Sequence, residues 1–183
     1  EVVRRHIRAV GKLDAFQRLS SYSMRGTMEQ GDQTTPFVLY KRGNNLRCEL
    51  DTQHPLGRLI LLYDGRNTWQ WLQHDVSTRI EPMPAAISSW MAREASFSPI
   101  LATYQETGQQ AELLGLSRIP ENEFLVYQIR LVNPRDESEI DVFLDSISLL
   151  EVRRDFRPQP GAAVLETLFD DYRVVDGFVI PFS

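Results

Sequence analysis

The chain has 183 residues, the usual size of one folded domain, and a domain of this length buries roughly 70% of the surface of its unfolded chain. Its 25 acidic and 20 basic side chains give a formal charge of −5, which argues against nucleic-acid binding through phosphate contacts and does not favour anionic lipid surfaces. With 42% hydrophobic and 25% charged residues, the composition is that of a globular protein and excludes intrinsic disorder.

The first predicted element is an amphipathic helix over about residues 2–19. Apolar side chains recur at steps of three and four, separated by arginine and lysine: Val3, Ile7, Val10, Leu13 and Phe16. One stripe of this helix therefore packs inward.

From Ser20 the period of the sequence changes to two, which is typical of strands. The first strand runs from Ser20 to a hairpin turn at Gly31-Asp32. Five more lie at about 33–42, 45–53, 58–63, 67–73 and 76–81. Consecutive short strands separated by turns predict a continuous antiparallel sheet.

Two short helices interrupt the strands after Pro82 and Pro84. Apolar residues fall there at helical spacing in two groups: Ile87, Trp90 and Met91, then Phe97, Ile100, Leu101 and Tyr104. Strand patterns return at about 109–117, 123–132, 138–145, 148–156, 163–174 and 178–182. We predict one α+β domain over residues 1–183, in which a large antiparallel sheet of about 11 strands curls around an interior and helices cover its open side.

The sequence lacks the motifs of common catalytic sites. It has no G-x-S-x-G, H-E-x-x-H, P-loop or Rossmann pattern, and its single cysteine, Cys48, excludes an intrachain disulfide and a cysteine-based metal cluster. His6, His54 and His74 have no ligand-type partner four residues on, and Asp141 shares a strand face with Asp145 that is best read as solvated surface. We expect no catalytic residues, no metal and no cofactor.

No apolar run reaches the roughly 20 residues of a membrane-spanning helix. The longest is the strand-length run from Leu59 to Tyr63. Because the sequence begins at Glu1, we expect that a signal or lipid-anchor segment precedes it in the full protein.

Three tryptophans are the most suggestive apolar residues. Trp69 and Trp71 share one face of a predicted strand, and Trp90 lies on a predicted covering helix. They line a ligand cavity or fill an ordinary core, and the sequence leaves both readings open. The four methionines, Met24, Met28, Met83 and Met91, suit a compliant cavity wall or gap filling equally well.

Three segments carry a resemblance to a known family. The segment from Tyr40 to Arg47, the segment from Leu61 to Trp71 and the ending from Phe169 to Pro181 resemble the periplasmic lipoprotein carriers of the LolA/LolB type and their outer-membrane lipoprotein-sorting relatives. The resemblance implies a half-open β-barrel, closed by a helical lid at about 84–105, that accepts lipoprotein acyl chains. It also implies a monomer in the periplasm that binds lipoprotein acyl chains or other lipid, meets a membrane-bound donor or acceptor protein, and binds no nucleic acid.

The resemblance also suggests site residues. Arg42 matches the family's strand arginine, which holds the lid closed over the empty cavity, although Gly43 stands where the carriers usually have proline. If Arg42 points inward, the period of two turns Tyr40 and Val38 inward as well and leaves Phe37 and Leu39 on the other face. The predicted ligand-binding residues are Val38, Tyr40, Trp69, Trp71, Ile87, Trp90, Met91, Ile100, Leu101 and Tyr104.

The same fold admits other functions. A sensor or interaction module of the cell envelope would bind a partner protein instead of a lipid. An enzyme on this fold would need titratable groups with perturbed pKa values in the cavity, and no sequence motif demands them.

Overall fold

The computed structural model describes residues 1–11, 16, 18–30, 32–52, 57–73, 78–119 and 124–182. The chain divides into two compact units, which are described separately: Leu19–Phe97, and Glu1–Arg18 together with Ser98–Ser183. His54 and His74 lie outside the described residues. None of the described helices is long and apolar enough to cross a membrane.

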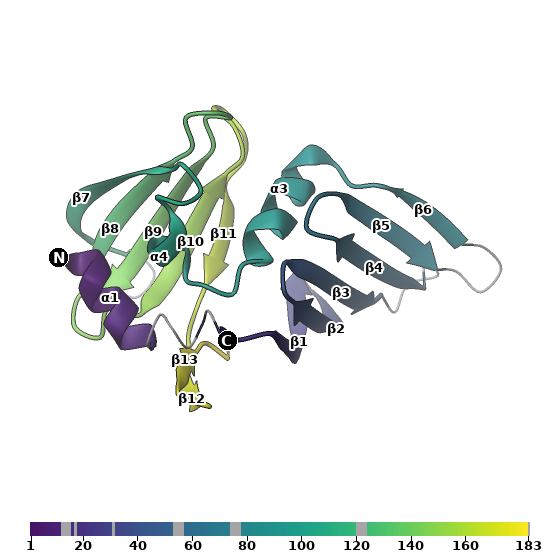
Figure 1. The fold of residues 1–183 in the computed structure, drawn as a ribbon, viewed down its shortest axis with the longest axis horizontal. Helices are drawn as coiled ribbons and strands as arrows, with labels where there is room; N and C mark the ends of the chain where they lie inside the picture. The colour runs from purple at the N-terminus through teal and green to yellow at the C-terminus, as the bar shows by residue number, and fades with distance from the viewer. Residues whose placement is uncertain are drawn as a thin grey trace. The chain divides into compact units, whose positions relative to one another are not determined.

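The Leu19–Phe97 unit is a six-stranded antiparallel sheet with one described helix (Figure 1). The strands pair in chain order: β1 (Ser21–Gln30), β2 (Gln33–Arg42), β3 (Asn45–Asp51), β4 (Arg58–Tyr63), β5 (Thr68–Gln73) and β6 (Thr78–Pro82). The helix α3 (Ala85–Glu94) follows them. The structure confirms the predicted succession of six hairpin-linked strands.

The helix α3 packs on one face of this sheet, which we call the helix face. Its Met91 and the following Ala95 join a buried cluster with strand residues of that face: Leu39, Leu46, Cys48 and Leu50. Phe37, Leu59, Leu61 and Tyr63 pack against the same cluster. The Ser88 and Thr68 hydroxyl oxygens, 2.5 Å apart, add a polar contact between α3 and β5.

The opposite face of the sheet, which we call the open face, carries the alternate residues. Cross-strand partners share a face, so the register joins Val38, Glu49, Ile60, Trp71 and Ile80 in one row, and Tyr40, Arg47, Leu62, Trp69 and Pro82 in the next. The two faces of β2 therefore divide as predicted by the period of two. However, Leu39 and Lys41, not Val38 and Tyr40, face the helix.

The other unit contains a five-stranded antiparallel sheet and a two-stranded one. The larger has the order β11 (Leu165–Leu168), β10 (Glu151–Arg157), β9 (Glu139–Asp145), β8 (Leu125–Val132) and β7 (Gln110–Arg118). β12 (Arg173–Val175) and β13 (Phe178–Ile180) form the smaller sheet. The core of the larger sheet is made of alternate residues of its central strands: Ile129, Leu131, Ile140, Val142 and Leu144.

Two helices, α1 (Val2–Val10) and α4 (Ile100–Thr103), belong to the same unit and contact each other (Figure 1). The buried His6 of α1 donates from Nδ1 to the Leu149 carbonyl oxygen at 2.8 Å, which ties the helix to the β9–β10 turn. α1 ends at Val10 because Gly11 takes a φ of 135°, a backbone conformation that favours glycine. The predicted helix to residue 19 is therefore interrupted at Gly11, and residues 12–15 and 17 lie outside the described part.

The strands are divided differently from the prediction. The described strands form sheets of six, five and two strands instead of one continuous sheet of about 11. The strand expected at 163–174 is split into β11 and β12, and Asp171 between them has a φ of 49°, which no strand residue adopts. The α+β class and the antiparallel pairing are confirmed, and the half-open barrel stays a prediction.

Candidate functional site

The predicted ligand-binding residues lie in different places. Val38, Tyr40, Trp69 and Trp71 lie on the open face, whereas Met91 is fully buried on the helix face. A strand sends successive side chains to opposite faces, so these residues cannot line one wall together with Met91.

The predicted lid residues also divide. Ile87 is exposed on α3, and Trp90 lies in the same helix but its side chain falls outside the described ones. Ile100, Leu101 and Tyr104 belong to α4 and its C-terminal end in the other unit, where Leu101 is fully buried and the other two are half-buried. Their predicted contact with a ligand stays a prediction.

The helix face has an apolar margin that the sequence did not single out as a unit. Tyr22, Met24 and Met28 on β1 point to this face and stay 36%, 39% and 45% exposed. Beside them Phe37 of β2 packs against the buried cluster. We call these four residues the methionine strip.

A glycine shapes this strip. A Cβ atom built on Gly26 would lie 3.0 Å from the Phe37 ring, so the ring lies directly on the backbone of β1. The glycine thus gives Phe37 room between Met24 and Met28, and the strip is a continuous apolar surface. Methionine side chains are flexible and polarisable, and they suit contact with apolar chains of variable shape. The alternation of Tyr22, Met24 and Met28 on β1 was the sequence signal for this surface.

Lys41 fastens the chain after α3 to the strands of the helix face. Its ammonium Nζ donates to the Ser96 carbonyl oxygen at 2.8 Å. The same Nζ lies 5.3 Å from the centre of the Tyr22 ring and 5.6 Å from that of Phe97, and these rings pack edge to face. Lys41 is buried, so the contact is made where water competes little. The cation thus joins one end of the methionine strip to the predicted lid segment.

Arg42, the residue predicted to close the lid, points the other way. It is exposed at the end of β2 on the open face. Because neighbouring strand residues alternate, the side chain that reaches the segment after α3 is Lys41. The sequence missed Lys41 because a lysine at a strand end is usually solvated.

The five-stranded sheet has a similar apolar margin. Leu113 and Leu116 on β7 and Leu165 on β11 share the face of the buried Ile129, Val142 and Phe156, but remain exposed at the sheet edges. Each unit therefore presents uncovered apolar side chains on the face that also carries its core.

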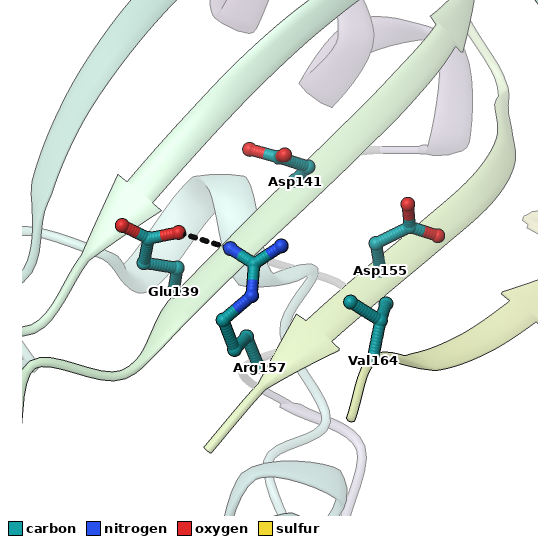
Figure 2. Close-up of a pocket in the computed structure, with 5 residues that line it drawn as sticks. All are labelled: Glu139, Asp141, Asp155, Arg157 and Val164. Atoms are coloured by element: carbon teal, nitrogen blue, oxygen red, sulfur yellow. Dashed lines mark hydrogen bonds and ion pairs between the residues drawn. The ribbon is translucent and has the colours of Figure 1, made fainter. Parts of the chain in front are cut away.

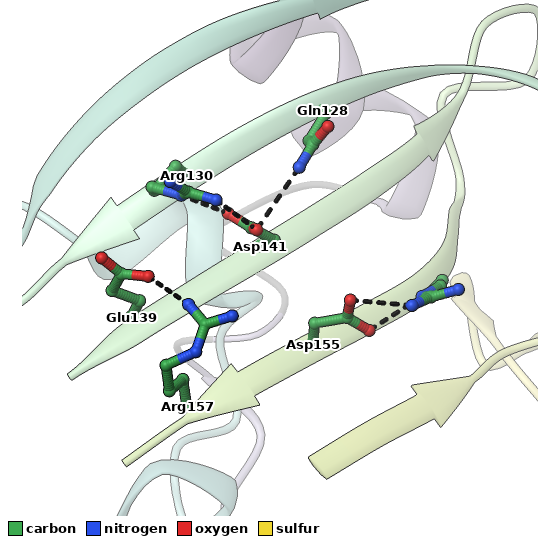
Figure 3. A network of polar contacts seen from close by, with 7 residues as sticks. Gln128, Arg130, Glu139, Asp141, Asp155 and Arg157 are labelled. Atoms are coloured by element: carbon green, nitrogen blue, oxygen red, sulfur yellow. Dashed lines mark hydrogen bonds and ion pairs between the residues drawn. The ribbon is translucent and has the colours of Figure 1, made fainter. Parts of the chain in front are cut away.

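The other face of this sheet is a ladder of ion pairs (Figure 3). Arg130 donates to both Asp141 carboxylate oxygens at 2.8 Å, and Gln128 donates to the same carboxylate at 3.3 Å. Arg153 donates to the carboxylate of Asp155, which follows it on the same face of β10. Asp141 thus has partners within its own sheet, and its side chain is only 12% exposed, so it is less solvated than the sequence predicted.

A small pocket opens within this ladder (Figure 2), lined by Glu139, Asp141, Asp155, Arg157 and Val164. Glu139 and Arg157 form an ion pair across it. Such a charged lining does not suit an apolar ligand. Within the described ranges, no His, Cys, Asp and Glu side chains gather in a group that could hold a metal ion.

Cys48 does not offer a nucleophile either. It is buried in the cluster under α3, and desolvation, together with the nearby Glu49 carboxylate, raises the pKa of its thiol to about 11. The thiol therefore stays protonated at neutral pH.

No protein-family model matches the chain, and no curated protein sequence matches it. Solved structures do. A LolA superfamily protein from Nitrosomonas europaea matches with a TM-score of 0.58 at 9% identity, over 98% of this chain and 80% of that one. A DUF1329 family protein from Desulfovibrio piger matches with a TM-score of 0.59 at 12% identity, over 98% and 82%.

A third structure, described as an outer membrane lipoprotein-sorting protein domain from Vibrio parahaemolyticus, matches with a TM-score of 0.57 at 13% identity, over 98% of this chain and 83% of that one. These matches confirm the resemblance to the LolA-like superfamily at the level of the fold. They extend over nearly the whole chain.

Proposed function

We propose that this chain, which has a LolA-like fold, is a non-catalytic carrier or binding protein for lipoprotein acyl chains or other apolar ligands in the cell envelope. The observation that supports the proposal most directly is the methionine strip. It is an uncovered apolar surface that continues the buried cluster beneath α3. An acyl chain on this strip would extend the packing of the sheet against its helix.

The hydrophobic effect supplies enough free energy for such binding. At about 0.8 kcal/mol for each buried methylene, eight methylenes contribute roughly 6 kcal/mol before the entropic cost of binding. Binding of this strength is reversible, as a carrier requires. No covalent step is involved.

The lid segment at 84–105 provides a means of release. Lys41 holds the chain after α3 to the strands next to the strip through its contacts with Ser96 and Phe97. In this proposal, the protein with a bound acyl chain and the empty protein differ in whether these Lys41 contacts are present. Closure of the lid segment's part in the same unit, residues 84–97, onto the strip would displace a bound chain. We assign Lys41 the role that the sequence suggested for Arg42, and we keep Ile87, exposed on α3, as a ligand contact.

Native mass spectrometry of the purified protein, before and after denaturing extraction, tests the proposal. We expect a co-purifying acyl species, or uptake of a fluorescent fatty acid by the empty protein. Met24→Glu and Met28→Glu should each weaken fatty-acid binding at least roughly tenfold, because each places a charge where the apolar chain would lie.

Val174→Glu is the matched control, because Val174 is exposed on β12 in the other unit. It should leave fatty-acid binding unchanged. An empty protein that takes up no fatty acid would contradict the proposal and would favour a module that binds a partner protein.

A further inference from the structure

The open face of the six-stranded sheet has a different chemistry from that expected of a solvated sheet face. An antiparallel sheet with one buried face usually turns polar residues to water on the other. Here the open face carries Val38 and Tyr40 on β2, Leu62 on β4 and Ile80 on β6, with Tyr40 42% and Ile80 62% exposed. Its apolar character is therefore not explained by the buried cluster under α3, which lies on the helix face.

Two tryptophans lie on this face, on β5 beside the edge strand β6. Trp69 pairs with Leu62, and Trp71 pairs with Ile60. Ile60 is only 2% exposed, although α3, the one helix described in this unit, packs on the opposite face. The indole Nε1 of Trp71 is buried and has no hydrogen-bond partner among the described residues. Tyr40, which is 42% exposed on this face, combines an apolar ring with a polar atom, a combination enriched at the interface between membrane and water.

The charges of this face differ from those of the whole chain. The described charged side chains on it are four arginines and two carboxylates: Arg25, Arg42, Arg47, Arg58, Glu49 and Asp51. The Arg47 and Arg58 guanidiniums both bind Glu49, at 2.6 and 3.4 Å. Arg25 and Arg42 are exposed on the two strands at one side of the face. The described side chains of this face thus carry an excess of positive charge on a chain whose formal charge is −5.

A face with exposed apolar and aromatic side chains and with exposed arginines on one side is complementary to an anionic phospholipid surface. Arginine forms bidentate hydrogen bonds to phosphate, and aromatic rings sit at the level of the headgroups. We infer that the open face docks on anionic phospholipid membranes, with Tyr40 and Ile80 at the headgroup boundary and Arg25 and Arg42 against the phosphates. The inference does not depend on acyl-chain binding at the methionine strip, which lies on the other face.

Flotation with vesicles tests this docking. We expect the protein to bind vesicles of phosphatidylethanolamine and phosphatidylglycerol, to bind pure phosphatidylcholine vesicles much less, and to be released by high salt. Each arginine near an anionic surface is worth about fivefold in affinity, so Arg25→Glu combined with Arg42→Glu should weaken binding at least about 25-fold. Tyr40→Ser combined with Ile80→Ser should also weaken it.

Control variants on the other unit separate docking from general surface effects. Arg135→Glu and Ile147→Ser remove an exposed arginine and an exposed isoleucine there, and both should bind vesicles as the wild type does. The variant that combines Arg25→Glu with Arg42→Glu lies outside the methionine strip and should keep the fatty-acid binding of the wild type, so failure of docking is distinguishable from failure of the carrier function.

Tryptophan fluorescence gives a direct readout. In a Trp90→Phe variant the emission comes from Trp69 and Trp71, and vesicles of brominated phosphatidylglycerol should quench it. The inference is overturned if the wild type binds no anionic vesicles, if the open-face variants bind as well as the controls, or if bound protein shows no quenching.

Discussion

Lys41 and Arg42 are adjacent cations with opposite environments. Lys41 is buried, donates to the Ser96 carbonyl and lies against two aromatic rings, whereas Arg42 is exposed on the open face. Only their position in the strand, one residue apart, distinguishes them. At the scale of the residue, the environment of a side chain therefore depends on the face of the sheet to which its strand position directs it.

We expect Lys41→Met to lower the free energy of unfolding by about 1–3 kcal/mol, since the Ser96 carbonyl would lose a charged donor while the apolar stem is kept. Amides near Ser96 should exchange hydrogen faster. Urea unfolding and hydrogen-exchange mass spectrometry measure both effects. Arg42→Met should change neither, and an equal effect of the two substitutions would argue against a specific role of Lys41.

His6 is a buried titratable group that holds α1 in place. Desolvation lowers the pKa of His6 below 6.5, and this outweighs the opposite influence of the Leu149 carbonyl and the Glu151 carboxylate, while Arg154 lowers it further. The neutral ring is therefore the form that fits the folded protein.

This pKa shift predicts a loss of stability in acid. The unfolded chain binds a proton at His6 near pH 6.5, and the folded chain binds it only at lower pH, so the stabilisation is complete above pH 6.5 and is lost as the pH falls below it. We expect the free energy of unfolding to fall more between about pH 7.5 and 5.5 for the wild type than for His6→Asn, which keeps a donor but does not titrate. Equal pH dependence in urea titrations would contradict this role.

At the scale of the element, α3 has a structural side and an exposed side. Met91 is 0% exposed in the cluster under the helix, whereas Ile87, one turn earlier, is 39% exposed. Both were predicted as ligand contacts from the helical spacing of apolar residues. The spacing identified the helix and its apolar residues, but only Ile87 is free to meet a ligand without unpacking the sheet.

Alanine substitution distinguishes the two residues. Met91→Ala should lower the free energy of unfolding by about 2–5 kcal/mol because it leaves a cavity in the core. Ile87→Ala should change it by less than about 0.5 kcal/mol, because an exposed side chain away from the core contributes little, and should instead weaken fatty-acid binding. Thermal unfolding and fatty-acid titration of both variants check these results. A large loss of stability in Ile87→Ala would place its side chain in the core.

At the scale of the whole molecule, the order of segments along the chain couples the two units. Residues 1–18 and 98–183 form one unit, and residues 19–97 form the other between them. For α1 to pack in its unit, the chain of residues 19–97 must form a loop that brings residues 1–18 back to residues 98–183. A folded intervening unit shortens that loop, so its stability lowers the entropic cost of placing α1.

A core substitution in one unit should therefore reduce the protection of amides in the other. Leu46→Ala removes a fully buried side chain in the Leu19–Phe97 unit. In mild urea, where this unit unfolds, we expect the amides of α1 to lose protection on the order of 1 kcal/mol through the longer loop. Hydrogen-exchange mass spectrometry of wild type and variant measures this. Unchanged exchange in α1 would mean that the two units fold independently.

Much of this fold follows from local sequence patterns. The period of two and the turn residues predicted β1–β6 and their pairing in chain order, because hairpin connections leave little freedom in which strands meet. The helical spacing after Pro84 predicted α3 and α4. The absence of catalytic motifs and the LolA-like resemblance also came from the sequence.

The tertiary structure alone decided which face of a strand meets a helix. In β2 both sets of alternate residues contain apolar side chains, Phe37 and Leu39 on one side and Val38 and Tyr40 on the other, so composition does not choose between them. The packing of α3 decided the choice, because its Met91 and the following Ala95 form one buried cluster with Leu39. That packing turned Lys41 toward the lid segment and left the tryptophans on the open face, because a side-chain period of two reverses every assignment when the buried face changes.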